Sequence, residues 1–394
     1  MKVLVVHNIL WAHYKSLIFQ ELFKQTQSSP DISIKVVQIA RNERSRASFE
    51  AAADPNAPVY TYPYTLLYDQ FIEDLSVRDR FRGLLAQTRQ FKPDVIYLTG
   101  YYDPAQILLL FYARWQNIRV VIQNESTAAD HQRGGWKEWV KRRITRLSDG
   151  FFCFGSRSAD YLIQLGVPPN KILLRKNAVD NHVLLKTYQE SLPSRTQRQQ
   201  QLGLPANNFI FVGRLIDVKN LETLIEAFAL ANQQVQATTD SALSRWGLIL
   251  FGEGPLQEKL SQRIQALGLQ HLVRFLPGQP WYRVPESLSL ADVLVLPSWS
   301  ETWGLVVNEA MVCGMPVIVS ERCGCAIDLV QHGRNGFVIN PYKPEELANY
   351  MTMFMNNDVN RAQMGQAARQ LIEPYAPEAV AREMLQGFVK LNGS

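Results

Sequence analysis

The stretch LVLPSWSETWGLVVNEAM, residues 294–311, has the pattern of a buried strand, a polar loop and a helix. Its first apolar run ends near Leu296, and the apolar spacing from Gly304 onward favours a helix. A strand followed by a helix is the repeating unit of a parallel sheet. The stretch therefore predicts an α/β fold, with Glu301 in the loop beyond the strand and Glu309 over a turn into the helix.

Short apolar runs alternate with amphipathic stretches on both sides of this segment, which is typical of a parallel sheet covered by helices. The runs of the first half of the chain lie at 3–6, 34–39, 95–98, 120–122 and 151–154. Those of the second half lie at 209–212, 248–251, 273–276, 293–296, 317–319 and 336–339. The alternation predicts two doubly wound, Rossmann-like parallel-sheet domains. Because such sheets bind ligands beyond the carboxyl ends of their strands, we expect the domains to face a cleft that holds the site.

A polar segment separates the two sets of runs. Residues 188–202 are rich in Gln, Ser, Arg and Pro and contain few apolar residues, which indicates a surface linker. We expect an N-terminal domain at 1–187, a linker at 188–205, a C-terminal domain at 206–375 and a final helix at 376–394 that crosses back to the N-terminal domain. The length of 394 residues fits two domains, because one core rarely grows beyond about 250–300 residues.

Composition and charge exclude several classes of protein. A content of 46% hydrophobic and 20% charged residues is that of a globular chain without a disorder signature. The net charge of +5 is mild, so it allows an anionic partner such as a nucleotide and gives no indication of nucleic acid. The four cysteines and six histidines lack the spacing of a metal site, and the cysteines do not form a disulfide scaffold. Met1 is followed by no signal-peptide core, so we expect a cytoplasmic protein with reduced cysteines.

Residues 294–311 also have the chemistry of a phosphate and sugar site. The start of a helix offers unpaired N–H groups and a positive dipole end, which suit a phosphate. Glu301 is placed to hold sugar hydroxyls, and Glu309 to hold both hydroxyls of a ribose. A glycosidase pair is an alternative, and it needs carboxyl groups about 5–9.5 Å apart. Eight positions on one helix rise about 12 Å, which disfavours that alternative, although the loop position of Glu301 leaves it open.

Two further strand ends carry candidate ligand-binding residues. FIFVGRLIDVKN, residues 209–220, delivers Gly213, Arg214 and Lys219 beyond a buried strand. An Arg fork and a Lys point charge can together neutralise a diphosphate leaving group. Gly252-Glu-Gly-Pro255 ends the next strand, and its two glycines are half of a dinucleotide fingerprint, which makes a nicotinamide cofactor a poor fit.

Polar residues also follow the strands of the N-terminal half. Lys15 lies at the first strand-to-helix turn, Asp103 follows the run at 95–98, and Asn124 and Glu125 follow the run at 120–122. We expect these four residues on the side of the cleft that binds the acceptor, the second substrate of the transfer. Asp103 and Glu125 are candidates for acceptor binding or proton handling.

The segment from Lys137 to Arg146 has the pattern of a helix with a cationic face. Such a face can rest on an anionic membrane surface. A solvated basic face over a packed Trp is the simpler interpretation, and the sequence leaves both open.

At these motifs the sequence resembles the retaining glycosyltransferases of family four, which have the GT-B fold. The resemblance is specific from about Phe209 to Leu347 and looser before that. The matching motifs occur in the expected order: Gly213-Arg214 with Lys219-Asn220, Gly252-Glu-Gly-Pro255, Glu301-x7-Glu309, Gly314-Met-Pro316 and Gly333-Arg-Asn-Gly336-Phe. The resemblance implies a donor in the C-terminal domain, an acceptor in the N-terminal domain, and transfer without a metal or other cofactor and with retention at the anomeric carbon.

The resemblance also implies roles for individual residues. The donor diphosphate would meet Arg214, Lys219 and the helix start at Gly304, Leu305 and Val306. The ribose would meet Glu309, the sugar would meet Glu301, Thr302, Trp303 and Gly304, and the base would meet Leu276 and Gly252. The catalytic candidates are Glu301 and Glu125. No enzymic nucleophile is implied, and we expect front-face attack in which the donor phosphate takes the acceptor proton.

Two departures from the family pattern fall on the acceptor side. Trp11-Ala-His-Tyr-Lys15 stands where many members carry a Gly-Gly pair, and Asn124-Glu125 stands where many carry a His. We expect a retaining hexosyltransferase that uses a nucleoside-diphosphate sugar and a saccharide or lipid-linked acceptor, in cell-surface polysaccharide or glycolipid synthesis. The alternatives are a sugar-phosphate or glucan synthase or phosphorylase of the same fold with a soluble acceptor, and a non-catalytic nucleotide-sugar-binding module.

Overall fold

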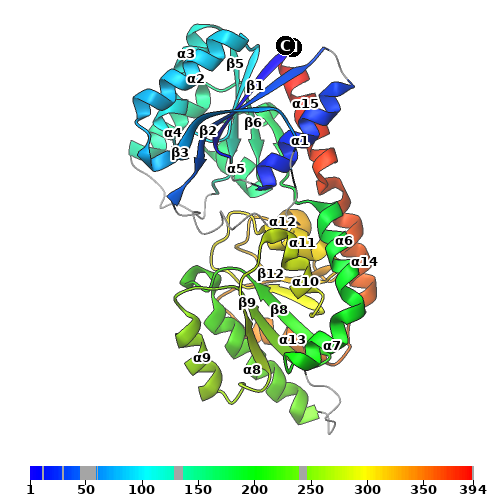
Figure 1. The fold of residues 1–394 in the computed structure, drawn as a ribbon. Helices are drawn as coiled ribbons and strands as arrows, with labels where there is room; N and C mark the ends of the chain where they lie inside the picture. The colour runs from blue at the N-terminus through cyan, green and yellow to red at the C-terminus, as the bar shows by residue number, and fades with distance from the viewer. Residues whose placement is uncertain are drawn as a thin grey trace. The chain divides into compact units, whose positions relative to one another are not determined.

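The computed structural model describes residues 1–10, 13–28, 31–44, 59, 61–127, 136–238 and 246–392. The chain divides into two compact units, and the final segment belongs to the first. Unit 1 comprises Met1–Asp180 and Tyr375–Ser394, and unit 2 comprises Asn181–Pro374. Each unit is built on a parallel sheet flanked by helices, as the sequence predicts (Figure 1).

Within the described residues, unit 1 contains a seven-stranded parallel sheet of order β3-β2-β1-β4-β5-β6-β7. Its strands are β1 (Lys2–Ile9), β2 (Ser33–Asn42), β3 (Tyr64–Phe71), β4 (Val95–Leu98), β5 (Arg119–Asn124), β6 (Gly150–Cys153) and β7 (Ile172–Arg175). Its helices are α1 (His13–Gln27), α2 (Val77–Phe91), α3 (Pro104–Trp115), α4 (Trp136–Arg146), α5 (Ser156–Gln164) and α15 (Pro377–Asn392).

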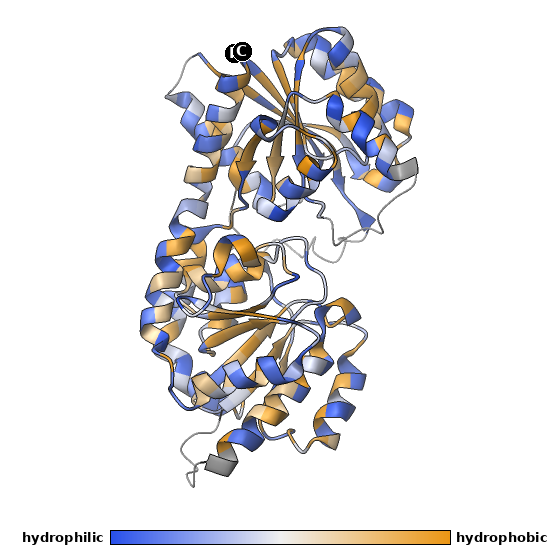
Figure 2. Ribbon diagram, turned by 180° about the vertical axis from the view of Figure 1, so that it is seen from behind, coloured by the Kyte–Doolittle hydropathy of each residue, from blue (hydrophilic) through white to orange (hydrophobic). Residues whose placement is uncertain are grey.

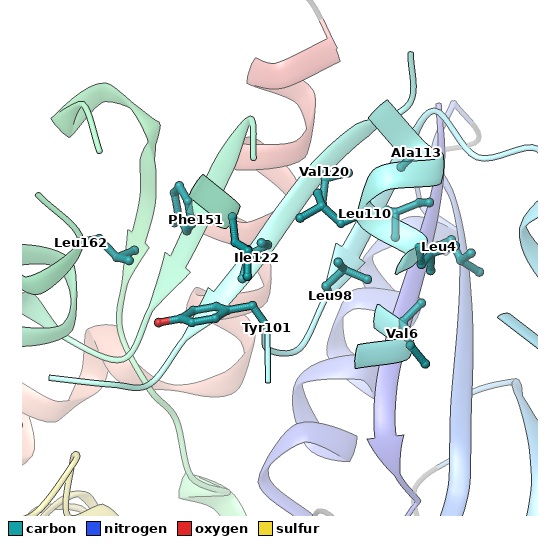
Figure 3. Packing of buried hydrophobic residues seen from close by; sticks show 14 of the residues in the cluster. Leu4, Val6, Leu98, Tyr101, Leu110, Ala113, Val120, Ile122, Phe151 and Leu162 are labelled. Carbon is teal, nitrogen blue, oxygen red and sulfur yellow. The ribbon is translucent and has the colours of Figure 1, made fainter. Parts of the chain in front are cut away.

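Alternate residues of each strand belong to two separate cores of unit 1, because successive side chains of a strand point to opposite faces. On β1, Leu4 and Val6 join a cluster with residues of α2, α3, α4 and α5 (Figure 3). Val3 and Val5 join a second cluster with residues of α1 and α15. The sheet is therefore covered on both faces, which explains why its central strands are continuously apolar.

The last helix completes the second of these cores. On α15, Phe388 packs edge-on against Phe152 and Tyr97, with ring centroids 5.2 and 6.0 Å apart. Glu383 forms an ion pair with Lys176 at 2.5 Å. The C-terminal segment thus packs into the unit that contains the first strand of the chain.

Within the described residues, unit 2 contains a six-stranded parallel sheet of order β10-β9-β8-β11-β12-β13. Its strands are β8 (Asn207–Val212), β9 (Trp246–Phe251), β10 (Val273–Leu276), β11 (Val293–Leu296), β12 (Val317–Ser320) and β13 (Gly336–Ile339). Its helices are α6 (Asn181–Ser191), α7 (Arg195–Gln201), α8 (Leu221–Thr238), α9 (Gln257–Ala266), α10 (Val284–Leu288), α11 (Leu305–Val312), α12 (Ala326–Leu329), α13 (Pro344–Met355) and α14 (Arg361–Ile372).

Two groups of helices pack on the unit 2 sheet. Helix α8 contacts α9 and α13, while α11 contacts α6, α10 and α14 (Figure 1). The central strands are mostly apolar and lie inside both units, whereas the helices alternate between polar and apolar residues (Figure 2). This is the layering expected of amphipathic helices on a buried parallel sheet.

The segment at 188–205, expected as a linker, is helical and belongs to unit 2. It contains the end of α6, a short 3₁₀ turn and α7. Two of its polar residues have partners within unit 2, although others such as Gln197 and Gln200 are exposed: Gln199 is buried and donates to the carbonyls of Ala206 and Leu290, and Arg195 pairs with Asp292 at 2.9 Å. The boundary between the two units falls after Asp180, before this segment begins.

Candidate functional site

The order of the unit 2 strands reverses between β8 and β11, and Lys219 and Glu301 lie at this point. β8 pairs with β9 on one side and with β11 on the other. Loops that leave the two central strands of such a sheet diverge and create room for a ligand. Lys219 follows β8, Glu301 follows β11, and their side chains form an ion pair although 82 positions separate them. Each side chain is less than one fifth exposed.

Asn220 ties the loops of this region together. Its backbone is in the left-handed conformation at φ 57°, which Asn adopts more readily than most residues. Its buried side-chain amide donates to the carbonyl oxygens of Pro297 at 3.1 Å and Pro341 at 2.9 Å. The residue thereby joins the loops after β8, β11 and β13 and fixes the neighbouring Lys219. Sequence reasoning placed Asn220 in a motif without assigning it a role.

Backbone hydrogen bonds from residues 323–325 hold the loop that carries Glu301. The Glu301 carbonyl accepts from the amide of Gly324 at 2.8 Å, and the Trp303 carbonyl accepts from the amide of Cys325 at 3.1 Å. A Cβ on Gly324 would lie 1.9 Å from the Thr302 oxygen, so only glycine fits there. The side chain of Trp303 is buried and donates to Asn308, so this residue can offer only backbone groups to a ligand.

Helix α11 begins directly after this loop. Gly304 has φ 99°, a left-handed conformation, and a Cβ there would be 3.0 Å from Leu296. Gly304, the N-cap of α11, has no side chain, so the amides of Leu305 and Val306 in the first turn receive no hydrogen bond from the capping residue. The N-terminus of this helix therefore presents N–H groups beside the pair of Lys219 and Glu301, an arrangement suited to an anion.

Glu309 lies one turn further into α11 and is 4% exposed. A buried carboxylate is rare in a protein core and marks a position with a specific partner. Burial, and next the negative charge of Glu309, hold the pKa of the Cys313 thiol well above its ordinary value. Burial has the same effect on the pKa of Cys325. Neither thiol is therefore an activated nucleophile.

Gly252 and Leu276, which the resemblance predicts to meet the base, lie close together. The amide of Gly252 donates to the carbonyl of Leu276 at 2.9 Å, and the amide of Gly213 donates to Phe251 at 3.0 Å. A Cβ on Gly252 would lie 2.0 Å from the Gly213 oxygen. The ends of β8, β9 and β10 are therefore in direct backbone contact. Arg214, next to Gly213, is exposed and forms no ion pair with any residue that the structure describes.

In unit 1 the strand order reverses between β1 and β4, and a cluster of ionisable side chains lies near the end of β1. Lys15 on α1 pairs with Glu125 at 3.3 Å, and its ammonium lies 3.6 Å from the centroid of the Phe154 ring. Gln123 donates a further hydrogen bond to Glu125, whose side chain is half exposed. Two of the predicted acceptor-side residues are thus in contact.

His7 belongs to this cluster and was missed by sequence reasoning. It lies in the buried part of β1, and its Nδ1 lies 2.6 Å from the Ile9 carbonyl and 2.9 Å from Oε1 of Gln38. Because both partners are acceptors, Nδ1 carries the proton of the neutral ring. Burial, and next the charge of Lys15, lower the pKa of His7 to about 4. A polar residue at the end of an apolar run was the available signal.

Asp103 and Asn124 are engaged in holding the fold. Asp103 caps α3 through the amide of Ala105 and pairs with Arg80 at 3.0 Å, and both side chains of this pair are nearly buried. Asn124 is 1% exposed and donates to Ser126 and Ser158. Their side chains position the loops after β4 and β5, and their role on the acceptor side stays a prediction.

Several expectations concern what the site lacks. Within the described parts of the chain, no group of His, Cys, Asp and Glu has the arrangement of a metal site. No described helix combines the length and apolarity that crossing a membrane requires. Trp11 and Ala12 of the first loop lie outside the described residues.

Two family models match this chain and together cover most of it. Residues 194–371 match the glycosyl transferases group 1, and residues 33–178 match the glycosyl transferase 4-like domain. The chain belongs to the group 1 glycosyltransferases, and its two parallel-sheet units are those of the GT-B fold.

Two curated relatives match parts of the chain. It is 29% identical over 201 residues to D-inositol 3-phosphate glycosyltransferase of Arthrobacter sp. (strain FB24), covering 49% of this chain and 45% of the relative. It is 28% identical over 221 residues to N-acetyl-alpha-D-glucosaminyl L-malate synthase of Bacillus anthracis, covering 55% and 53%. The chain spans about half the length of the curated relatives it matches.

Solved structures share the fold along the whole chain. Anabaena HepE in complex with UDP superposes with a TM-score of 0.74 at 19% identity, covering 99% of this chain and all of HepE. Sucrose-phosphate synthase from Thermosynechococcus elongatus superposes with a TM-score of 0.72 at 18% identity, covering both chains completely.

Proposed function

We propose that this protein transfers a hexose-type sugar from a nucleoside-diphosphate sugar to a saccharide or lipid-linked acceptor, with retention at the anomeric carbon. The observation that carries the proposal is the Lys219–Glu301 pair beside the uncapped start of α11. A cation, an anion and a row of N–H groups then lie where a diphosphate and a sugar need them.

In this proposal unit 2 binds the donor. Lys219, Arg214 and the amides of Gly304, Leu305 and Val306 bind the diphosphate. Glu309 accepts hydrogen bonds from the ribose, and the backbone near Gly252 and Leu276 meets the base. Glu301, with the backbone of residues 302–304, binds hydroxyls of the sugar. Support for a nucleotide-sugar donor comes from the related fold of HepE, which was solved with UDP and with UDP-glucose.

The transfer step uses no residue as a nucleophile. The bond between the anomeric carbon and the diphosphate oxygen breaks, and the acceptor oxygen forms its bond on the same face of the sugar. The acceptor proton passes to a phosphate oxygen of the departing nucleoside diphosphate. Lys219 and Arg214 stabilise the charge that develops on the diphosphate, which is the main electrostatic task of the step. The step needs no metal and no further cofactor.

Unit 1 binds the acceptor in this proposal. Glu125, held by Lys15 and Gln123, is the exposed carboxylate of the cluster and hydrogen-bonds an acceptor hydroxyl. His7 is neutral at physiological pH and keeps its Nδ1 proton on Ile9 and Gln38. We expect Glu125 to orient a polar acceptor rather than an apolar one.

We further propose cell-surface polysaccharide or glycolipid synthesis at the cytoplasmic face of a membrane, contacted through the Lys137–Arg146 segment. Helix α4 carries five basic residues and one acidic residue, which favours an anionic surface. A soluble acceptor is the alternative, and it is favoured by relatives whose names specify an inositol phosphate and malate.

Radiolabelled UDP-, GDP- and ADP-sugars, each incubated with the protein and a membrane extract, test the proposal. Label in the lipid-extractable or polymeric fraction supports it, whereas label only in small water-soluble products replaces the lipid-linked version with the soluble one. The same assay with Lys219→Ala should transfer no label, while Lys259→Ala, a matched surface lysine on α9 paired with Glu222, should match the wild type. Nucleotide-sugar binding without transfer to any acceptor would favour a binding module.

A further inference from the structure

Tyr102 exposes an aromatic ring beyond the carboxyl end of β4. It immediately precedes Asp103, the cap of α3, and it is 60% exposed. Its hydroxyl hydrogen-bonds the hydroxyl of Ser126, which follows β5. Its ring stacks on that of Tyr101, with centroids 4.9 Å apart and an angle of 26° between the planes. One face of the ring is therefore covered and held, and the exposed area belongs to the rest of the ring.

The support beneath this ring is fixed by buried contacts. Tyr101 is 4% exposed and belongs to the core cluster that Figure 3 shows. Its hydroxyl donates to the side-chain oxygen of Asn124 at 3.2 Å, and the Asn124 amide donates to the Ser126 carbonyl at 3.0 Å. The hydrogen bond between Ser126 and Tyr102 closes this circuit. A ring that is already held in place loses little freedom when a ligand stacks on it, which favours binding.

Glu125 places a carboxylate next to the ring. It directly precedes Ser126, the partner of the Tyr102 hydroxyl, and the Cα atoms of neighbouring residues are about 3.8 Å apart. Lys15 at 3.3 Å and the side-chain amide of Gln123 both contact Oε1 of Glu125. Neither of these contacts uses Oε2, and the side chain is half exposed. The carboxylate is thus oriented through one oxygen and can meet a ligand through the other.

The charges of the cluster indicate which class of ligand fits. The Lys15 side chain is only 12% exposed and is neutralised by Glu125. A second cation, Lys141, donates to the Tyr161 hydroxyl at 3.2 Å and lies 5.8 Å from the centroid of the Tyr102 ring. Of the pair formed by Lys15 and Glu125, the group that reaches solvent is therefore the carboxylate. A carboxylate accepts hydrogen bonds from hydroxyl groups and repels a phosphate or another carboxylate.

We propose that Tyr102 and Glu125 form an acceptor subsite for an uncharged pyranose ring. A pyranose presents C–H groups on its face, and these pack against the negative face of an aromatic ring. Its equatorial hydroxyls lie around the edge of the ring, where Glu125 accepts a hydrogen bond. The two contacts together favour a saccharide over an acceptor that offers only a phosphate, a carboxylate or a lipid chain. This inference rests on the proposed function and names the substrate class of its acceptor.

Saturation-transfer-difference NMR of the full chain, without any sugar nucleotide, tests this subsite. The probes are methyl glycosides of glucose, galactose, mannose and N-acetylglucosamine, with L-malate and D-inositol 3-phosphate as anionic competitors. The wild type should bind at least one neutral glycoside and should bind both anions more weakly. Tyr102→Ala should weaken the binding of that glycoside about tenfold, the upper end of what one aromatic contact contributes. Tyr102→Phe keeps the ring and should retain most of the affinity.

Glu125→Gln should change the affinity for the two classes of ligand in opposite directions. Binding of the neutral glycoside should weaken about tenfold or more, because a hydrogen bond to a charged group is lost. Binding of D-inositol 3-phosphate should become stronger, because a negative charge is removed and Lys15 is released. A structural role alone would weaken both ligands together, and that result would overturn the proposal.

Matched controls come from unit 1. Tyr64→Ala removes a 46% exposed tyrosine of β3, and Asp160→Asn removes a half-exposed carboxylate of α5. Both variants should bind the glycoside like the wild type, and all variants should keep the wild-type unfolding temperature. Unchanged binding in Tyr102→Ala and Glu125→Gln would overturn the proposal. So would a wild type that binds none of the neutral glycosides.

Transfer assays separate this subsite from the proposed function. If sugar is transferred and the KM for the acceptor is the same in Tyr102→Ala as in the wild type, the subsite is wrong and the transfer stands. If glycosides bind through Tyr102 but no donor is consumed, the transfer is wrong and the subsite stands. Titration with UDP, GDP or ADP should give the same affinity for Tyr102→Ala as for the wild type, since the proposed donor site lies in unit 2.

Discussion

Lys219 and Glu301 form an ion pair at the point where the strand order of the unit 2 sheet reverses. Each side chain extends from a loop that backbone contacts hold in place, because Val218 accepts a hydrogen bond from the amide of Trp299 at 2.9 Å. The pair therefore keeps a cation and an anion beside the start of α11 without bound substrate. A diphosphate that engages Lys219 would release Glu301 to the sugar.

The first prediction concerns Lys219. Lys219→Ala should weaken the binding of the preferred nucleoside diphosphate about tenfold to a hundredfold, the usual worth of a hydrogen bond to a charged group. Isothermal titration calorimetry measures this, with Lys259→Ala as the control for a lost surface charge. Unchanged affinity in Lys219→Ala would refute the assignment of the diphosphate site.

Glu301 should behave in the opposite way. Glu301→Gln removes the negative charge that competes for Lys219, so the affinity for a nucleoside diphosphate should stay equal or rise. Transfer of the sugar should fall by about tenfold or more, because a charge-assisted hydrogen bond to the sugar is lost. A kcat that matches the wild type, measured with saturating donor, would argue against any contact of Glu301 with the sugar.

Gly252 supplies a test of the strand-end geometry. Its φ is 131°, and a Cβ would lie 2.0 Å from the Gly213 oxygen, so Gly252→Ala must both strain its backbone and push two strand ends apart. We expect a loss of about 3 kcal/mol or more in the free energy of unfolding. Gly268→Ala is the control, because Gly268 has φ 69° but no atom within 4 Å of the added Cβ. It should lose only about 1–2 kcal/mol in urea denaturation.

The sequence predicted the buried central strands well because a strand covered on both faces is continuously apolar. The edge strands of unit 1 escaped prediction: β3 (Tyr64–Phe71), for example, has half-exposed residues throughout, so its composition resembles that of a loop. The α6–α7 segment escaped prediction for a related reason. Gln199 donates to a buried backbone carbonyl and Arg195 pairs with Asp292, but in the sequence alone such polar residues resemble those of a linker.

The same limit applies to the candidate site. Lys219 and Glu301 were predictable as neighbours, because both follow strands of one parallel sheet. The role of Asn220 was not, because its partners Pro297 and Pro341 lie 77 and 121 positions away and accept through backbone oxygens, which carry no signal in the sequence. The internal contacts of Asp103 and Asn124 were not predictable either, because a sequence does not show which strand-end polar residues serve as caps.

Asn220 should therefore affect catalysis without touching the substrate. Asn220→Gly keeps access to the left-handed backbone and removes the two hydrogen bonds to Pro297 and Pro341. We expect a loss of about 2 kcal/mol in stability and a lower kcat, because Lys219 loses its fixed position. Asn117→Gly, at another left-handed Asn, is the control and should change neither quantity. A wild-type kcat in Asn220→Gly would show that Asn220 stabilises the fold and does not affect catalysis.

His7 should make the stability of the protein depend on pH in the weakly acidic range. Burial lowers its pKa in the folded state to about 4 from 6.5, so the unfolded chain binds the proton more readily between these two values. Folding is then unaffected above about pH 6.5 and loses stability as the pH falls toward 4, by about 3 kcal/mol in all. Urea unfolding of the wild type and of His7→Gln between pH 7.5 and 4 measures the difference. The gap between the two curves should shrink by that amount on acidification, and parallel curves would show that His7 is protonated as readily in the folded chain as in the unfolded one.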